Sequence, residues 1–65
     1  MYKVTYCVNE YAERQEAGEF EGLSEAQEEC RALWNQGYAW PTVWYPDGRK
    51  SVITSDGFTK PELVK

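Results

Sequence analysis

The first eight residues alternate between two kinds of side chain. The largely apolar positions are Tyr2, Val4, Tyr6 and Val8, and the positions between them are Lys3, Thr5 and Cys7. A period of two predicts a β-strand whose apolar side faces the core. The charged stretch 9–18 has only weak periodicity, so we expect a loop or a short helix ended by Gly18. Residues 19–21 are expected to form a short edge strand.

A helix is predicted over residues 25–36. Its apolar positions are Ala26, Cys30, Leu33 and Trp34, spaced i, i+4, i+7 and i+8 so that they form one stripe. Ser24 and Gln27 have the spacing of a capping box, in which each side chain accepts a hydrogen bond from the backbone N–H of the other residue. Gly37 is suited to the position just after the helix, where positive φ is common.

Two further strands are predicted, over residues 38–45 and 50–54, with a turn at Pro46-Asp47-Gly48-Arg49 between them. Pro41 cannot donate to a strand ladder, so we expect an edge position, a bulge or a bend there. Alternation places Tyr38, Trp40 and Trp44 on one face, and Ala39, Pro41, Val43 and Tyr45 on the other. The expected fold is a single α+β domain over residues 1–65, with one helix packed on a three-stranded, mainly antiparallel sheet in the order β-α-β-β.

The residue types offer little for catalysis. The chain has no histidine, which removes the commonest general base and a common metal ligand. Neither cysteine has an evident base, and the glutamates of the predicted helix are typical of a solvated acidic face. Zinc-type cysteine pairs and calcium-loop spacings are missing from the sequence. We therefore expect no enzyme activity, no catalytic residues, no metal and no cofactor.

The two cysteines, Cys7 and Cys30, are expected on opposite faces of the sheet. They could not then reach the Cα spacing of about 5.5 Å that a disulfide needs, so we expect free thiols. Two cysteines are also too few for the disulfide framework of a small secreted domain. The sequence shows no signal-peptide pattern and no apolar run of membrane-spanning length. These features favour a cytoplasmic protein that does not enter a membrane.

The charge is negative overall and unevenly placed. The formal net charge is −4, and residues 10–29 contain eight glutamates against a single arginine. This disfavours direct nucleic-acid binding, which needs a basic surface. It favours attraction to a basic protein. The expected acidic patch consists of Glu10, Glu13, Glu16, Glu19 and Glu21.

Aromatic side chains make up 15% of the chain, and one helix covers only one face of a sheet. Either these rings all serve the core and the outer sheet face, or some stay exposed as a contact patch, because interface centres favour Trp, Tyr and Arg. The expected aromatic and basic patch consists of Tyr38, Trp40, Trp44, Tyr45 and Arg49. Its use could be a protein partner, self-association, or stacking of single-stranded nucleic acid. Only two basic side chains, Arg49 and Lys50, lie near the hairpin tip, and they are weak support for nucleic-acid binding.

Several local motifs occur together over residues 1–54. They are Leu23-Ser24-Glu25-Ala26, Gly37, Trp44-Tyr45 and Asp47-Gly48-Arg49. In this layout the chain resembles small acidic proteins carried by phages and mobile elements, including anti-CRISPR proteins. The resemblance implies a non-catalytic inhibitor that occupies a surface of a host protein that normally binds nucleic acid. The alternatives are a small homo-oligomeric structural protein, including a homodimer, and a weak single-stranded nucleic-acid binder.

Overall fold

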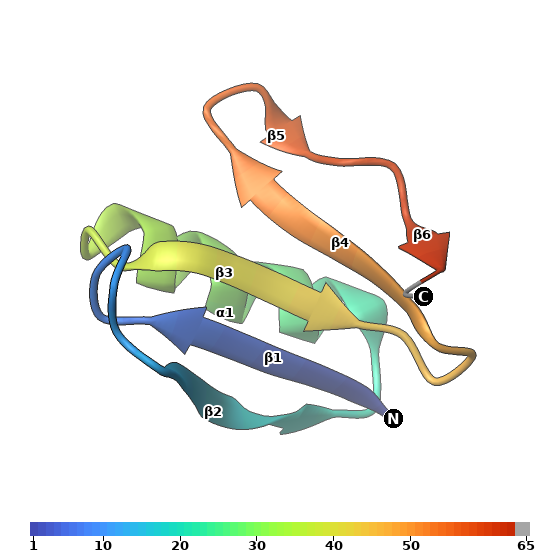
Figure 1. Cartoon of the computed structure of the whole chain (residues 1–65). Helices are drawn as coiled ribbons and strands as arrows, with labels where there is room; N and C mark the ends of the chain where they lie inside the picture. The colour runs from blue at the N-terminus through green and yellow to red at the C-terminus, as the bar shows by residue number, and fades with distance from the viewer. Residues whose placement is uncertain (64–65) are drawn as a thin grey trace.

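A computed structural model describes residues 1–63 as one helix and six strands (Figure 1). The elements in chain order are β1 (Tyr2–Cys7), β2 (Arg14–Phe20), α1 (Leu23–Asn35), β3 (Ala39–Trp44), β4 (Arg49–Thr54), β5 (Gly57–Phe58) and β6 (Glu62–Leu63). The predicted α+β class with one helix and an antiparallel sheet is confirmed. The predicted number of three strands is wrong, because β2, β5 and β6 join the sheet.

The strands follow the order β2-β1-β3-β4-β5, and β6 also pairs with β4. Every pairing is antiparallel. The second half of the segment expected to be a loop or short helix, residues 14–18, is instead strand, and it continues into the expected edge strand to form β2, which pairs with β1 at one edge. Its alternation is interrupted because Val4 pairs with Gly18 and Thr5 with Glu16, which leaves Ala17 as an extra residue. Gly18, with φ of +146°, adopts the backbone that this bulge requires.

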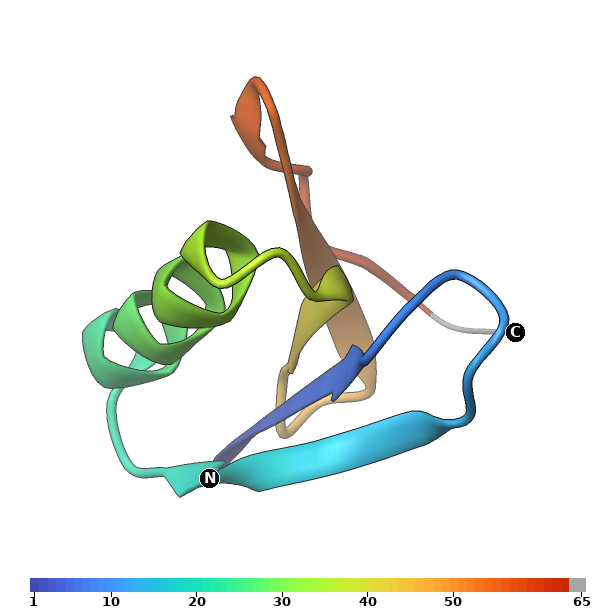
Figure 2. The same ribbon diagram turned by 90° about the vertical axis from the view of Figure 1, so that its left-hand side faces the viewer.

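The core lies between α1 and one face of the sheet, and Figure 2 shows the helix on a single side of the strands. Its buried centre consists of Val4, Ala26, Cys30, Leu33 and Val43. Val4 and Val43 are cross-strand partners beneath the helix. The predicted stripe is thus buried except for Trp34, which lies at its margin and is exposed. Val8 was predicted on the core side, but it lies beyond the end of β1 and is also exposed.

The two ends of α1 differ in how well local signals predict them. The helix begins at Leu23 with Gly22 as N-cap, and it receives no side-chain cap from residues 1–63. The predicted capping box is therefore wrong: an earlier start places Leu23 against the core and Ser24 inside the first turn. At the other end, Gly37 has φ of +89° and donates to the Trp34 carbonyl at 3.0 Å. Tyr38 donates to the Leu33 carbonyl at 3.2 Å, which completes a Schellman motif as expected of Gly37.

A bulge in β3 changes which side chains share a face. Thr5 pairs with Thr42 and Cys7 with Ala39, so Trp40 and Pro41 together occupy the space opposite a single β1 residue. The expected bulge is therefore present, and it lies in a central strand. The extra residue returns Tyr38 to the helix side, so its predicted grouping with Trp40 and Trp44 is wrong.

Trp40 has φ of +56°, the only positive value outside glycine in residues 1–63. This conformation strains any residue with a Cβ by about 1–2 kcal/mol. We expect Trp40→Gly to be more stable than Trp40→Ala by about 1 kcal/mol, since both remove the indole and only glycine relieves the strain. Urea unfolding of the two variants measures the difference.

The control is Gln15, an exposed position of β2. There the stabilities of the two variants should be reversed, so that Gln15→Gly is less stable than Gln15→Ala. An alanine variant at Trp40 as stable as the glycine variant would contradict the strained backbone.

Candidate functional site

Four exposed apolar residues belong to segments at one end of the molecule. At this end β1 leads into the loop before β2, and α1 leads into β3 (Figures 1 and 2). The residues are Tyr11, Trp40, Val8 and Trp34, with exposed fractions of 95%, 54%, 51% and 40%. We call these four residues the apolar end. The other two large exposed apolar residues of the described chain, Met1 and Leu63, lie near the opposite end.

The backbone around Trp40 holds its indole outward. Pro41 is fully buried behind it, and the Thr42 hydroxyl donates to the Trp40 carbonyl at 2.8 Å. The bulge is therefore fixed on both sides of the strained residue. Backbone strain of this kind persists where the surrounding structure determines it, and it is frequent at functional sites.

Tyr11 is presented by a compact turn. The side chain of Asn9 accepts from the Tyr11 backbone N–H at 2.8 Å, and the Asn9 carbonyl accepts from Ala12 at 3.2 Å. This is the arrangement of an Asx turn. Glu10 and Glu13, both exposed, lie close to Tyr11 in the sequence of this turn. The turn that carries the exposed Tyr11 ring of the apolar end therefore also carries two exposed carboxylates.

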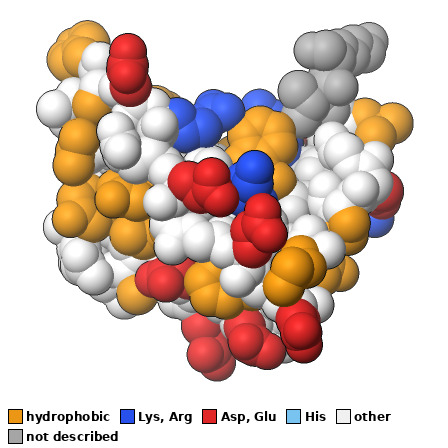
Figure 3. Space-filling model, turned by 90° about the horizontal axis from the view of Figure 1, so that it is seen from below, with side chains coloured by type: hydrophobic (Ala, Val, Ile, Leu, Met, Phe, Trp, Pro, Cys, Tyr) orange, Lys and Arg blue, Asp and Glu red, His pale blue; other side chains and the backbone are white. Residues whose placement is uncertain are grey.

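The five predicted acidic residues are all exposed, but they follow β2 instead of forming one patch. Glu10 and Glu13 belong to the loop at the apolar end. Glu16 and Glu19 lie in β2 opposite Thr5 and Lys3. Glu21 follows β2 at the other end of that strand. Figure 3 shows acidic side chains spread over the visible face, with a few basic ones between them.

The predicted aromatic patch is divided among separate places. Tyr38 packs beside Tyr6 with ring centroids 4.8 Å apart, and Tyr45 meets the edge of Tyr2 at 5.3 Å. Both tyrosines are partly buried against the core. Trp44 pairs with Lys3 and Lys50 and lies on the face away from Val43, whereas Trp40 belongs to the apolar end. The sheet thus exposes Trp40 far more than the other three aromatic members.

Trp44 is held in place on the outer face. Its indole Nε1 donates to the Thr5 hydroxyl at 2.7 Å. The Arg14 guanidinium lies 5.0 Å and the Lys50 ammonium 5.7 Å from its ring centroid, within the range of cation–π attraction. The Trp44 indole therefore already makes a hydrogen bond through its N–H and contacts with two cations. This arrangement favours a structural role over stacking with a nucleic-acid base.

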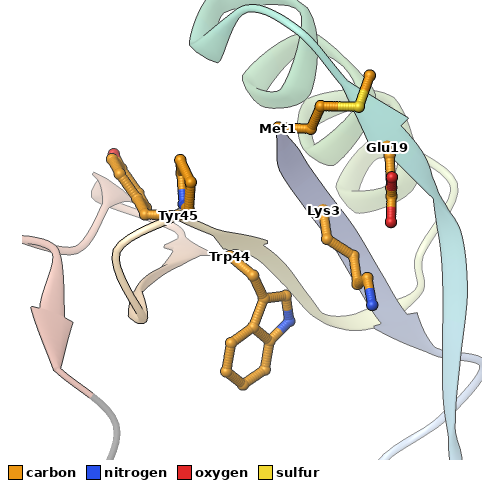
Figure 4. A pocket seen from close by; sticks show the side chains of 6 residues that line it. Met1, Lys3, Glu19, Trp44 and Tyr45 are labelled. Carbon is orange, nitrogen blue, oxygen red and sulfur yellow. The ribbon is translucent and has the colours of Figure 1, made fainter.

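Beside Trp44 lies an open, shallow pocket of about 510 Å³ (Figure 4). It is lined by Met1, Lys3, Glu19, Trp44, Tyr45 and Pro46. Lys3 and Glu19 are cross-strand partners, so opposite charges stand next to each other on its wall. The mixture of one cation, one carboxylate and apolar surface selects no particular ligand class.

Arg49 contacts Asp47 within the hairpin turn between β3 and β4. Its Nε donates to Asp47 Oδ2 at 2.7 Å, and its backbone N–H donates to Asp47 Oδ1 at 3.1 Å. The pKa of Asp47 is lowered, first by this backbone hydrogen bond and then by the Arg49 side chain. The guanidinium also lies 5.3 Å from the Tyr45 ring centroid. Arg49 therefore stabilises the hairpin turn.

Among residues 1–63, the buried titratable side chains are two thiols. Cys7 and Cys30 are both free and buried. Burial raises the pKa of Cys30 to about 12, and the nearby Glu29 carboxylate adds to the rise. Such a thiol is protonated at neutral pH and is a poor nucleophile. Within residues 1–63, no group of three or more Cys, Asp and Glu side chains is placed to hold a metal ion.

Sequence reasoning missed three members of the apolar end, Val8, Tyr11 and Trp34. Val8 and Trp34 continue apolar patterns whose buried part ends before them, and Tyr11 lies in a segment expected to be a loop or short helix. The Asn9 side chain, a frequent turn former, was the available signal for Tyr11. The one helix described in residues 1–63 is not long and apolar enough to cross a membrane. Comparisons with protein-family models, curated proteins and solved structures found no match.

Proposed function

We propose that this chain is a non-catalytic module that binds a basic protein partner through the apolar end. The observation that carries the proposal is Trp40, which is more than half exposed and is held by a strained bulge in a central strand. An indole in this position adds little to the core. Large exposed apolar side chains gathered in one region are typical of interaction sites.

The rim of the apolar end indicates the partner's chemistry. Glu10 and Glu13 are exposed around Tyr11, so a partner would present an apolar depression bordered by Lys or Arg. Charges at the rim mainly increase the association rate, whereas buried aromatic anchors supply most of the binding energy. Proteins that handle nucleic acid have basic surfaces of this kind. A phage-type inhibitor that occupies such a surface on a host protein fits both features.

Affinity capture from nuclease-treated lysate tests the proposal. The bait is the intact chain, compared with Trp40→Gly, which removes the indole and suits the positive φ, and with Leu63→Ala, which removes an exposed apolar side chain at the other end. We expect a stoichiometric protein that the chain and Leu63→Ala retain and that Trp40→Gly loses. The measured affinity should fall about thirtyfold or more in Trp40→Gly, as for an interface hot spot.

Equal binding by the chain and Trp40→Gly would contradict the proposal, provided that circular dichroism shows both to be folded. Two further outcomes would replace it. A dimer in sedimentation that Trp40→Gly dissociates would make the apolar end a contact between copies. A partner recovered only without nuclease treatment would indicate a nucleic-acid ligand.

A further inference from the structure

The two edges of the sheet are finished in different ways. The outer edge of β4 is covered along its length by the chain that follows it. β5 pairs with Ile53 and Thr54, and β6 pairs with Arg49 and Lys50.

Between these two pairings, the remaining polar groups at the edge of β4 are also satisfied. Thr59 N–H donates to the Val52 carbonyl at 2.9 Å, and Val52 N–H donates to the Thr59 hydroxyl at 3.0 Å. The Ser51 hydroxyl donates to the Thr59 carbonyl at 2.6 Å. The edge of β4 is therefore closed to an additional strand, and beyond it lie only the two-residue strands β5 and β6.

The opposite edge is open. β2 is seven residues long and is the last strand on its side in the described part of the chain. Only its β1 side is paired, so alternate backbone N–H and C=O groups face outward. An edge of this kind is a template for another strand.

The charges of β2 disfavour a second copy of this chain as the added strand. β2 carries Glu16 and Glu19 against Arg14 alone, so self-pairing brings together two strands of net negative charge. In the antiparallel register centred on Ala17 and Gly18, Glu16 of one copy would lie opposite Glu19 of the other, and the reverse. Like charges directly opposite each other destabilise a strand pair. The same two glutamates would stabilise a strand that carries Lys or Arg at those positions.

We infer that the free edge of β2 accepts an extended segment of the partner protein, in which basic and apolar side chains alternate. This inference rests on the proposed function, because it assumes a basic protein partner. Glu16 and Glu19 would face the basic positions. Ala17 and Phe20, which are partly buried against the core, would contact the apolar positions, since successive residues of a strand point to opposite faces.

A peptide of the same length as β2, with alternating lysine and valine and blocked ends, is the probe. Amide hydrogen exchange and NMR shifts of the intact chain are measured with and without it. We expect slower exchange at outward-facing amides of residues 14–20 and shift changes centred on that strand. A peptide of identical sequence with alternate backbone nitrogens methylated keeps the charge and cannot complete the ladder, so it should bind much more weakly.

The chain also offers a charge-matched pair of variants. Glu16→Gln with Glu19→Gln should weaken the lysine–valine peptide about tenfold. Glu25→Gln with Glu28→Gln, at exposed positions of α1, should leave its affinity unchanged. Equal weakening by both pairs, or equal binding of the methylated peptide, would overturn strand addition and leave general charge attraction.

The two proposals fail in different ways. A captured protein that is lost with Trp40→Gly but is insensitive to Glu16→Gln with Glu19→Gln would overturn only the strand addition. Peptide binding at β2 without any Trp40-dependent partner would overturn only the proposed use of the apolar end.

Discussion

Leu33→Ala is expected to lower the free energy of unfolding by about 2–5 kcal/mol. Leu33 is buried in the centre of the contact between α1 and the sheet, next to Val4, Val43, Ala26 and Cys30. Truncation removes apolar contacts and leaves a cavity that a two-layer domain cannot readily fill. A chain of this length has a total stability of roughly 3–10 kcal/mol, so the loss is a large fraction of the whole.

Urea unfolding followed by circular dichroism measures this loss. Leu63→Ala is the matched control, because it makes the same chemical change at an exposed position, where surface substitutions usually alter stability by less than about 0.5 kcal/mol. If Leu33→Ala and Leu63→Ala had similar stabilities, the described docking of α1 on the sheet would be incorrect.

The helix could be predicted from the sequence because its determinants are local. Ala26, Cys30 and Leu33 follow the helical period, and Gly37 lies where the chain must take positive φ. The N-terminus was misplaced because Ser24 and Gln27 have cap spacing, yet packing of Leu23 against the core moves the start of the helix. Tertiary contact outweighs a cap that contributes about 1 kcal/mol.

The strand β2 could not be predicted in the same way. Three of its seven residues are charged because the edge is exposed, and Ala17 and Gly18 form a bulge that breaks the alternation. What makes the segment a strand is its pairing with β1, a non-local interaction that a sequence window does not contain. The same is true of β5 and β6, which are two residues each and depend on β4.

The candidate site was only partly predictable for a related reason. Trp40 was singled out as an aromatic contact residue, and Pro41 indicated an irregularity. The bulge, however, decides that Tyr38 returns to the core and no longer shares a face with Trp44. The apolar end depends on such breaks in the pattern, because regular alternation would have placed Tyr38, Trp40 and Trp44 on one face.

Cys30 is expected to react with a thiol reagent at about one-thousandth of its unfolded rate near pH 8, from the change in thiolate fraction alone. Burial, with a smaller contribution from Glu29, raises its pKa from 9.0 to about 12. The thiol also has no exposed surface, so the true ratio should be larger. Stopped-flow labelling in a Cys7→Ala background, with and without urea, measures it.

The same pKa shift makes stability depend on pH in a defined direction. The folded chain keeps the Cys30 proton when the unfolded chain has begun to lose it. The stabilising contribution is therefore complete below pH 9.0 and is lost as the pH rises toward about 12. Cys30→Ala should remove this part of the alkaline destabilisation.

The outcome also bears on catalysis. A nucleophilic cysteine needs a lowered pKa and access to its substrate, and Cys30 has a raised pKa and a buried sulfur. If labelling of Cys30 is slow in the folded chain and becomes fast in urea, the result would agree with a thiol that only packs in the core. Fast labelling of the folded chain would mean that Cys30 is reachable and ionised, and the non-catalytic proposal would then have to be abandoned for a thiol-dependent activity.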